Sequence, residues 1–107
     1  MNIRIKVTKM ELSEDLKKYV ELKMNSLKKY LGDISVNNCD VELERSSTTQ
    51  NKGKLYRAEV NLNLPGEMLR VEKTEKTIIK AIDKVKDHLI LMIKKSKEKK
   101  LDQARGK

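Results

Sequence analysis

The stretch that decides the fold is KLYRAEVNLNLPGEMLRVEK, residues 54–73. In its first half, every second side chain is apolar: Tyr56, Ala58, Val60, Leu62 and Leu64. This alternation predicts a half-buried strand, because successive side chains of a strand point to opposite faces of the sheet. Pro65 and Gly66 predict a turn, and Leu69 and Val71 predict a returning strand with its apolar side on the same face.

Two further strands and a helix are predicted before this hairpin. Residues 2–8, NIRIKVT, alternate apolar and polar side chains, and so do residues 39–45. Between them, Ser13 predicts a helix N-cap, and Gly32 predicts the end of the same helix. Residues 46–53, SSTTQNKG, predict a polar loop before the hairpin.

A long amphipathic helix is predicted from about Thr74 into the lysine-rich C-terminal part of the chain. At 100° per residue, one side gathers Ile78, Ala81, Ile82, Val85, Leu89, Met92 and Ile93. The opposite side gathers Lys73, Lys76, Lys80, Lys84, Lys94 and Lys95, with Leu91 among them and His88 at the edge. The first side can pack on a sheet while the second presents positive charge.

This order predicts an α+β fold of the form β-α-β-β-β-α. Each strand has one apolar face and both helices are amphipathic, so we expect a four-stranded sheet, mixed or antiparallel, with both helices packed on one face. The other face mixes charges of both signs and is expected to be solvated. We predict one domain over residues 1–98 and a flexible, polar, basic tail over residues 99–107.

The net charge of +9 over 107 residues predicts a polyanionic partner. Residues 1–53 hold ten basic and eight acidic side chains, whereas residues 54–107 hold fifteen and eight. An anionic membrane is disfavoured, because the sheet needs the apolar side of the helix and the chain has no Trp or Phe. A solvated basic surface without a specific partner is the plain alternative.

Folded RNA fits the lysines best, since rows of lysine neutralise phosphates and read backbone geometry rather than bases. The three tyrosines are expected at core-flanking or inward positions, which argues against base stacking. With one histidine and one cysteine, the sequence indicates no catalytic constellation, no zinc site and no disulfide. We therefore expect no enzyme activity, no cofactor and no small-molecule substrate.

Three segments together resemble the ribosome hibernation-promoting factor family, the ribosome-associated inhibitors. They are ELSEDLKKYVELKMNSLKKYLGDI, AEVNLNLPGEMLRVE and TIIKAIDKVKDHLILMIKKSKEK. The resemblance implies that the protein binds the small ribosomal subunit in the channel used by mRNA and tRNA. It also implies contacts from both helices to ribosomal RNA, inhibition of translation and storage of ribosomes under stress. A cytoplasmic, ribosome-associated monomer is expected.

The residues expected to bind RNA come from both helices: Lys17, Lys23, Lys28, Lys29, Lys76, Lys80, Lys84, His88, Lys94, Lys95 and Lys97. The last helix departs from the family pattern, because Leu91 and Met92 replace an arginine and a glutamine, and His88 replaces a lysine. Longer members carry a C-terminal dimerisation domain. The chain is expected to be either a short member or the N-terminal domain of a long one.

Two other function classes stay open at this point. A general RNA-binding or chaperone-like module would use the same lysine-rich face without specificity for the ribosome. A protein-interaction module would instead use Ile79, Ile90 and Leu91 as an exposed contact patch.

Overall fold

A computed structural model describes residues 1–46 and 55–104. Its elements are β1 (Ile3–Thr8), α1 (Glu14–Asn25), α2 (Lys28–Leu31), β2 (Asn38–Arg45), β3 (Tyr56–Leu64), β4 (Glu67–Glu75) and α3 (Ile78–Ala104). Apart from Ser46, the predicted polar loop lies outside the described residues. The order confirms the predicted β-α-β-β-β-α arrangement, with the first helix divided in two.

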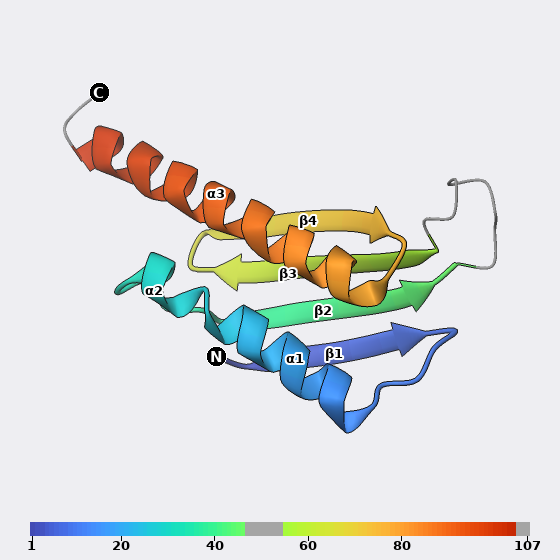
Figure 1. The fold of residues 1–107 in the computed structure, drawn as a ribbon. Coiled ribbons are helices and arrows are strands. Elements are labelled where there is room, and N and C mark those ends of the chain that lie inside the picture. Colours follow the sequence, from blue (N-terminus) through green and yellow to red (C-terminus); the bar gives the residue numbers. More distant parts are fainter. Residues whose placement is uncertain (47–54, 105–107) are drawn as a thin grey trace.

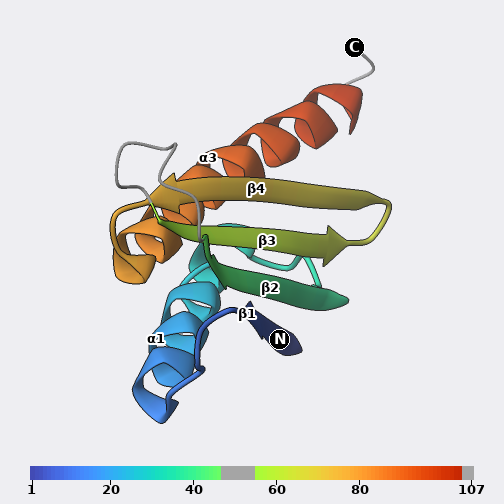
Figure 2. The ribbon, with the colours of Figure 1, turned by 90° about the vertical axis from the view of Figure 1, so that its right-hand side faces the viewer.

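The four strands form one mixed sheet in the order β1-β2-β3-β4. β1 pairs with β2 in parallel, while the β2–β3 and β3–β4 pairs are antiparallel. The parallel pair requires a crossover connection, and α1 and α2 supply it. Figures 1 and 2 show α1 and α3 together on one face of the sheet, which confirms the predicted layering.

The core lies between this sheet face and the helices. The inward residues of the predicted hairpin are almost fully buried, with Val60 and Leu64 1% exposed and Leu62 fully covered. α3 packs on β3 and β4, and α1 lies beside α3 over the β1 side of the sheet. Leu89 and Ile93 of α3 are fully buried against this layer.

The turn between β3 and β4 also anchors α3. Gly66 has a φ of 74°, a left-handed conformation that glycine adopts without a Cβ clash. Next to it, the Glu67 carboxylate accepts a hydrogen bond of 2.6 Å from the hydroxyl of Ser96, which is only 6% exposed. Lys100 lies 3.9 Å from the same carboxylate. The late turns of α3 are therefore tied to the hairpin.

The prediction of one continuous first helix was wrong, because α1 ends at Asn25 and a short α2 follows. At the break, the Ser26 hydroxyl donates to the Lys23 carbonyl, and Leu27 N–H donates to the Met24 carbonyl at 3.1 Å. A serine side chain that bonds the backbone competes with helical hydrogen bonding. The predicted end at Gly32 is confirmed, with a φ of 61°.

The predicted start of the last helix near Thr74 was also wrong, because β4 continues to Glu75 and α3 begins at Ile78. The Thr77 hydroxyl accepts a hydrogen bond of 3.1 Å from Lys80 N–H, as an N-cap does. Lys73 and Lys76 therefore lie outside the helix. At its other end α3 runs to Ala104 and projects past the sheet (Figure 1). The flexibility of residues 99–107 stays a prediction.

Two leucines of α3 provide a matched test of this packing. Leu89→Ala is expected to lower the free energy of unfolding by about 2–5 kcal/mol, because it opens a cavity in the core. Leu91→Ala, at a position 58% exposed, is expected to change it by no more than about 0.5 kcal/mol. Urea denaturation followed by circular dichroism measures both, and equal losses would contradict the assigned faces of α3.

Candidate nucleic-acid interface

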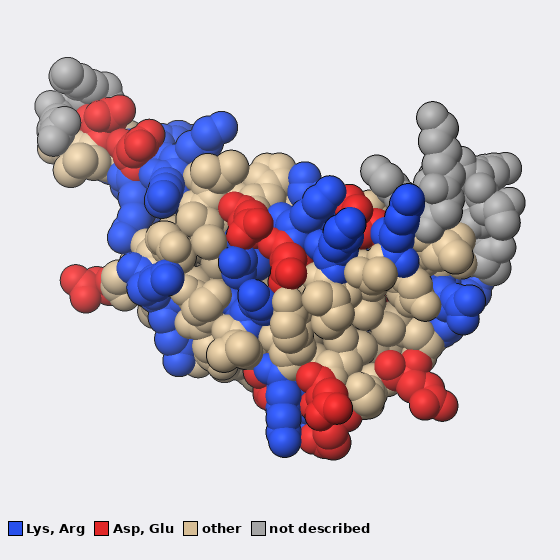
Figure 3. All heavy atoms as spheres, in the orientation of Figure 1, with Lys and Arg blue, Asp and Glu red and all other residues tan. Residues whose placement is uncertain are grey.

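The helix layer carries most of the positive side chains expected to bind RNA. In Figure 3, Lys and Arg gather along α3 and near α2, with a few acidic groups between them. Because these lysines come from three elements on one side of the sheet, their mutual distances are set by helix packing rather than by sequence spacing.

Two of the predicted RNA-binding lysines are engaged by acids. Lys84 Nζ lies 2.7 Å from a carboxylate oxygen of Glu75, a residue that is only 8% exposed. Lys23 Nζ lies 3.6 Å from Asp83. These pairs reduce the positive charge that either lysine offers to a phosphate, so the structure ranks them below the lysines without an acidic partner.

The other predicted lysines form no ion pair with the described part of the chain, and all are exposed: Lys17, Lys28, Lys29, Lys76, Lys80, Lys94, Lys95 and Lys97. His88 is exposed too, one helical turn after Lys84. The N–H donors of these lysines are available to an anion.

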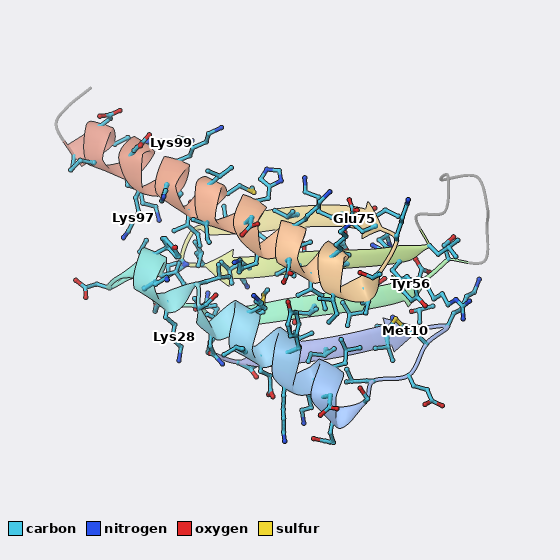
Figure 4. All side chains as sticks on the ribbon, in the orientation of Figure 1. Met10, Lys28, Tyr56, Glu75, Lys97 and Lys99 are labelled. Atoms are coloured by element: carbon cyan, nitrogen blue, oxygen red, sulfur yellow. The ribbon has the colours of Figure 1, made fainter. Side chains whose placement is uncertain are left out.

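The structure brings Lys29 and Tyr30 of α2 together with Lys94 and Lys97 of α3, a group we call the interhelical cluster. Lys29 Nζ and Lys94 Nζ lie 5.2 and 5.6 Å from the centroid of the Tyr30 ring. Lys97 Nζ lies 3.3 Å from the point where residue 32 would carry a Cβ. Figure 4 shows Lys97 extending from α3 toward α2.

Other predicted cations point elsewhere. Figure 4 shows Lys28 extending from α2 on the side away from α3. Lys84 contacts Glu75 of β4, and Lys95 lies on the same side of the helix by its spacing. The eleven expected residues therefore form no single patch. Some form the cluster between the helices, some form a more dispersed row along α3, and the others lie on α1, on the far side of α2 or just before α3.

Sequence reasoning missed Tyr30 as part of this surface. It placed the tyrosines beside the core, and Tyr30 is indeed half-buried against it. Its ring nevertheless attracts two ammonium groups, one of which comes from a helix 64 positions further along the chain. The adjacent Lys29–Tyr30 pair is the only local signal, and it does not identify the second lysine.

A polar tie holds α1 against α3. The Tyr19 hydroxyl donates to an Asp83 carboxylate oxygen at 2.5 Å, and Lys23 Nζ lies 5.2 Å from the Tyr19 ring centroid. Burial and this hydrogen bond raise the pKa of Tyr19 to about 12, so the phenol stays protonated as a donor. Asp83 thus links the two basic helices.

The opposite face of the sheet has a different character. The Arg57 guanidinium lies within 2.6–3.9 Å of four carboxylates, those of Glu42, Glu44, Glu59 and Glu72. Arg4 donates two hydrogen bonds to Asp40 and lowers the pKa of that carboxyl. The predicted solvation holds for Arg70, which is 65% exposed, but not for Glu59, whose residue is 8% exposed. These carboxylates would repel phosphate.

The rest of the described surface provides little for other ligands. Three surface pockets have volumes of about 250, 260 and 240 Å³. These volumes are below the roughly 300–1,000 Å³ of typical ligand pockets. Among residues 1–46 and 55–104, no three His, Cys, Asp or Glu side chains are grouped to hold a metal. No helix in the same ranges has the length and apolar character needed to span a membrane.

Comparisons with known proteins show which family this chain resembles. The sequence model of a family described as "Sigma 54 modulation protein / S30EA ribosomal protein" matches residues 3–101. A ribosome hibernation promotion factor of Deinococcus radiodurans is 30% identical over 94 residues, 88% of this chain and 48% of the relative. The chain thus spans about half the length of that curated relative.

Two solved structures share the fold. The N-terminal domain of Protein Y from Thermus thermophilus has a TM-score of 0.74 and 29% identity, covering 89% of this chain and 98% of that one. A ribosomal subunit interface protein from Coxiella burnetii has a TM-score of 0.66 and 20% identity, covering 92% and 99%. The second likeness supports the fold alone.

The tie between Tyr19 and Asp83 gives a pH-dependent prediction. The folded-state pKa of Tyr19 is raised to about 12 from an ordinary value near 10. The hydrogen bond to Asp83 therefore contributes fully to the free energy of unfolding below about pH 10. Its contribution is lost as the pH rises toward 12. Near-ultraviolet absorbance should therefore show a phenol that ionises only as the pH approaches about 12. Tyr19→Phe should remove that late step; its persistence in the variant would show that another tyrosine carries the raised pKa.

Proposed function

Because the chain belongs to the Sigma 54 modulation protein / S30EA ribosomal protein family, we propose that it binds the ribosome and regulates translation. The family is one of ribosome hibernation and modulation factors, which are not enzymes. In finer detail, the domain binds the small ribosomal subunit in the mRNA and tRNA channel, through contacts to ribosomal RNA. It inhibits translation there and promotes the storage of ribosomes in the cytoplasm under stress.

The observation that carries this proposal is the separation of charge between the two layers. The helix layer presents lysines without acidic partners in the described part of the chain, such as Lys29, Lys80 and Lys94. The far face of the sheet is covered by paired carboxylates and guanidinium groups. RNA phosphates are attracted to the first surface and repelled by the carboxylates of the second, so the helices face the RNA.

Inhibition in this proposal is occlusion rather than chemistry. The buried core and the Tyr19–Asp83 tie hold the helices in fixed positions, which suits an RNA whose phosphates are also fixed. The lysines neutralise those phosphates and release counterions. A domain seated in the channel then excludes mRNA and tRNA because two bodies cannot occupy the same volume.

Lys23 and Lys84 have a reduced part in this mechanism, since each already faces a carboxylate. They are assigned mainly to holding α3 against α1 and β4. The unpaired lysines supply the main attraction, with His88 as a neighbour on α3.

Charge reversal tests the proposed face. Lys94→Glu should weaken binding to small subunits by tenfold or more, because a like charge placed against phosphate costs several kcal/mol. Co-sedimentation with purified small subunits in a sucrose gradient measures this. The matched control is Lys6→Glu, an exposed residue of β1 on the far sheet face, which changes the net charge equally. It should sediment like the unaltered protein.

Equal losses in both variants would place the RNA contact elsewhere, and an unaltered protein that stays at the top of the gradient would refute the ribosomal proposal.

Competition separates this function from general RNA binding. An excess of unstructured RNA should displace the protein poorly from small subunits, because fixed phosphates match a fixed set of lysines. Displacement at stoichiometric amounts of unstructured RNA would instead favour a general RNA-binding or chaperone-like module.

A further inference from the structure

Tyr30 lies between two positive charges that come from different helices. Lys29 Nζ is 5.2 Å from its ring centroid and Lys94 Nζ is 5.6 Å from it. The sum of these distances keeps the two nitrogens within about 11 Å of each other. Because the Debye length is about 8 Å at physiological ionic strength, salt screens part of any repulsion between the two ammonium groups.

No carboxylate in the described part of the chain forms an ion pair with these cations. Neither Lys29 nor Lys94 forms an ion pair there, and Lys97 of the same cluster forms none. The contrast with Lys23 is informative, because its ammonium lies at a similar 5.2 Å from the Tyr19 ring but has Asp83 at 3.6 Å. The Tyr30 site repeats the arrangement of ring and cation and omits the carboxylate.

We propose that Tyr30 is a positioning residue that holds Lys29 and Lys94 in place to receive a phosphate group of the RNA backbone. This rests on the proposed function and names the chemistry of one of its contact points. The phosphate takes the place that the Asp83 carboxylate fills at Tyr19.

The chemistry of the ring and the ammonium groups fits this role. The face of an aromatic ring attracts a cation electrostatically, but it offers no lone pair that would satisfy the three N–H donors of an ammonium group. Each lysine is therefore restrained while most of its donors still point outward. A phosphate that meets restrained lysines avoids part of the entropy cost of ordering them, which is the advantage of preorganisation.

Lys97 and Gly32 extend the same site. The Lys97 ammonium comes so close to residue 32 that a Cβ there would lie 3.3 Å from Nζ, tighter than most such contacts. Gly32 also has a φ of 61°, which a larger residue adopts with strain. A glycine at this position therefore lets a third cation approach the end of α2, beside Lys29 and Lys94. Three cations that form no ion pair within the described residues suit a phosphate better than a singly charged carboxylate.

The test compares Tyr30→Phe with Tyr30→Leu in binding to small subunits over a range of salt concentrations. Phe keeps the ring face, so its affinity should stay within about twofold of that of the unaltered protein. The slope of log K against log salt should be unchanged. Leu keeps an apolar side chain but removes the ring. Because one cation–π contact is worth about two- to fivefold and Leu removes two of them, affinity should fall by about fourfold to twenty-fivefold. The slope of log K against log salt should become shallower by about one phosphate contact.

Tyr56→Leu is the matched control, since Arg45 lies 5.9 Å from the Tyr56 ring centroid at the other end of the sheet. It removes a comparable cation–π contact away from the cluster and should leave the salt slope unchanged. Circular dichroism checks that each variant is folded. An unchanged slope in Tyr30→Leu, or an equal change in Tyr56→Leu, would overturn the proposal.

Titration with sodium pyrophosphate separates this inference from the ribosomal function. In nuclear magnetic resonance spectra, the backbone amide signals of Lys29, Tyr30, Lys94 and Lys97 should shift before those of the rest of α3. Tyr30→Leu should bind pyrophosphate at least threefold more weakly, and Tyr30→Phe should not. If these shifts appear but small subunits do not bind, the proposed function fails and the phosphate site stands. Equal shifts along all of α3, or equal pyrophosphate affinity in Tyr30→Leu, would refute the phosphate site.

Discussion

The apolar side of α3 packed on β3 and β4 is the contact on which the rest of the structure depends. The sheet has one apolar face, and its burial requires both helices on that face. The side chains of α3 that do not reach the core must then face outward together, and lysine is the commonest residue among them. The basic surface is thus a direct consequence of how the core is covered. The far face of the sheet needs no cover and stabilises itself through the ion pairs around Arg57.

Periodicity was sufficient to predict the order of the elements and the layering, because each strand and helix carries its own apolar side. It failed where local polar chemistry decides the backbone. The break after Asn25 depends on the Ser26 hydroxyl, whose hydrogen bond to a backbone carbonyl a periodic pattern does not show. The end of β4 was misplaced because Lys73 and Glu75 occupy inward positions of the strand. At Glu75, Lys84 of α3 supplies an ion pair for the inward carboxylate.

The candidate site was predictable as a set of charges but not as a geometry. The sequence identifies which residues are cationic and which helix face they occupy. It does not indicate that Lys23 and Lys84 face carboxylates from other elements, nor that Tyr30 lies between cations of α2 and α3. These contacts join residues far apart in the chain and exist only after the helices are packed. The same packing links stability to function, because Asp83 joins the two helices that carry the lysines.

The central claim is that the helix layer faces ribosomal RNA while the far sheet face does not. Lysine acetylation followed by mass spectrometry measures this directly, since every lysine of the unaltered protein reports its own accessibility in the free and the small-subunit-bound states. Binding should strongly protect Lys29, Lys80, Lys94 and Lys97, while Lys6 on the sheet face should remain reactive. Protection of Lys6 together with unchanged reactivity of the helix lysines would contradict it.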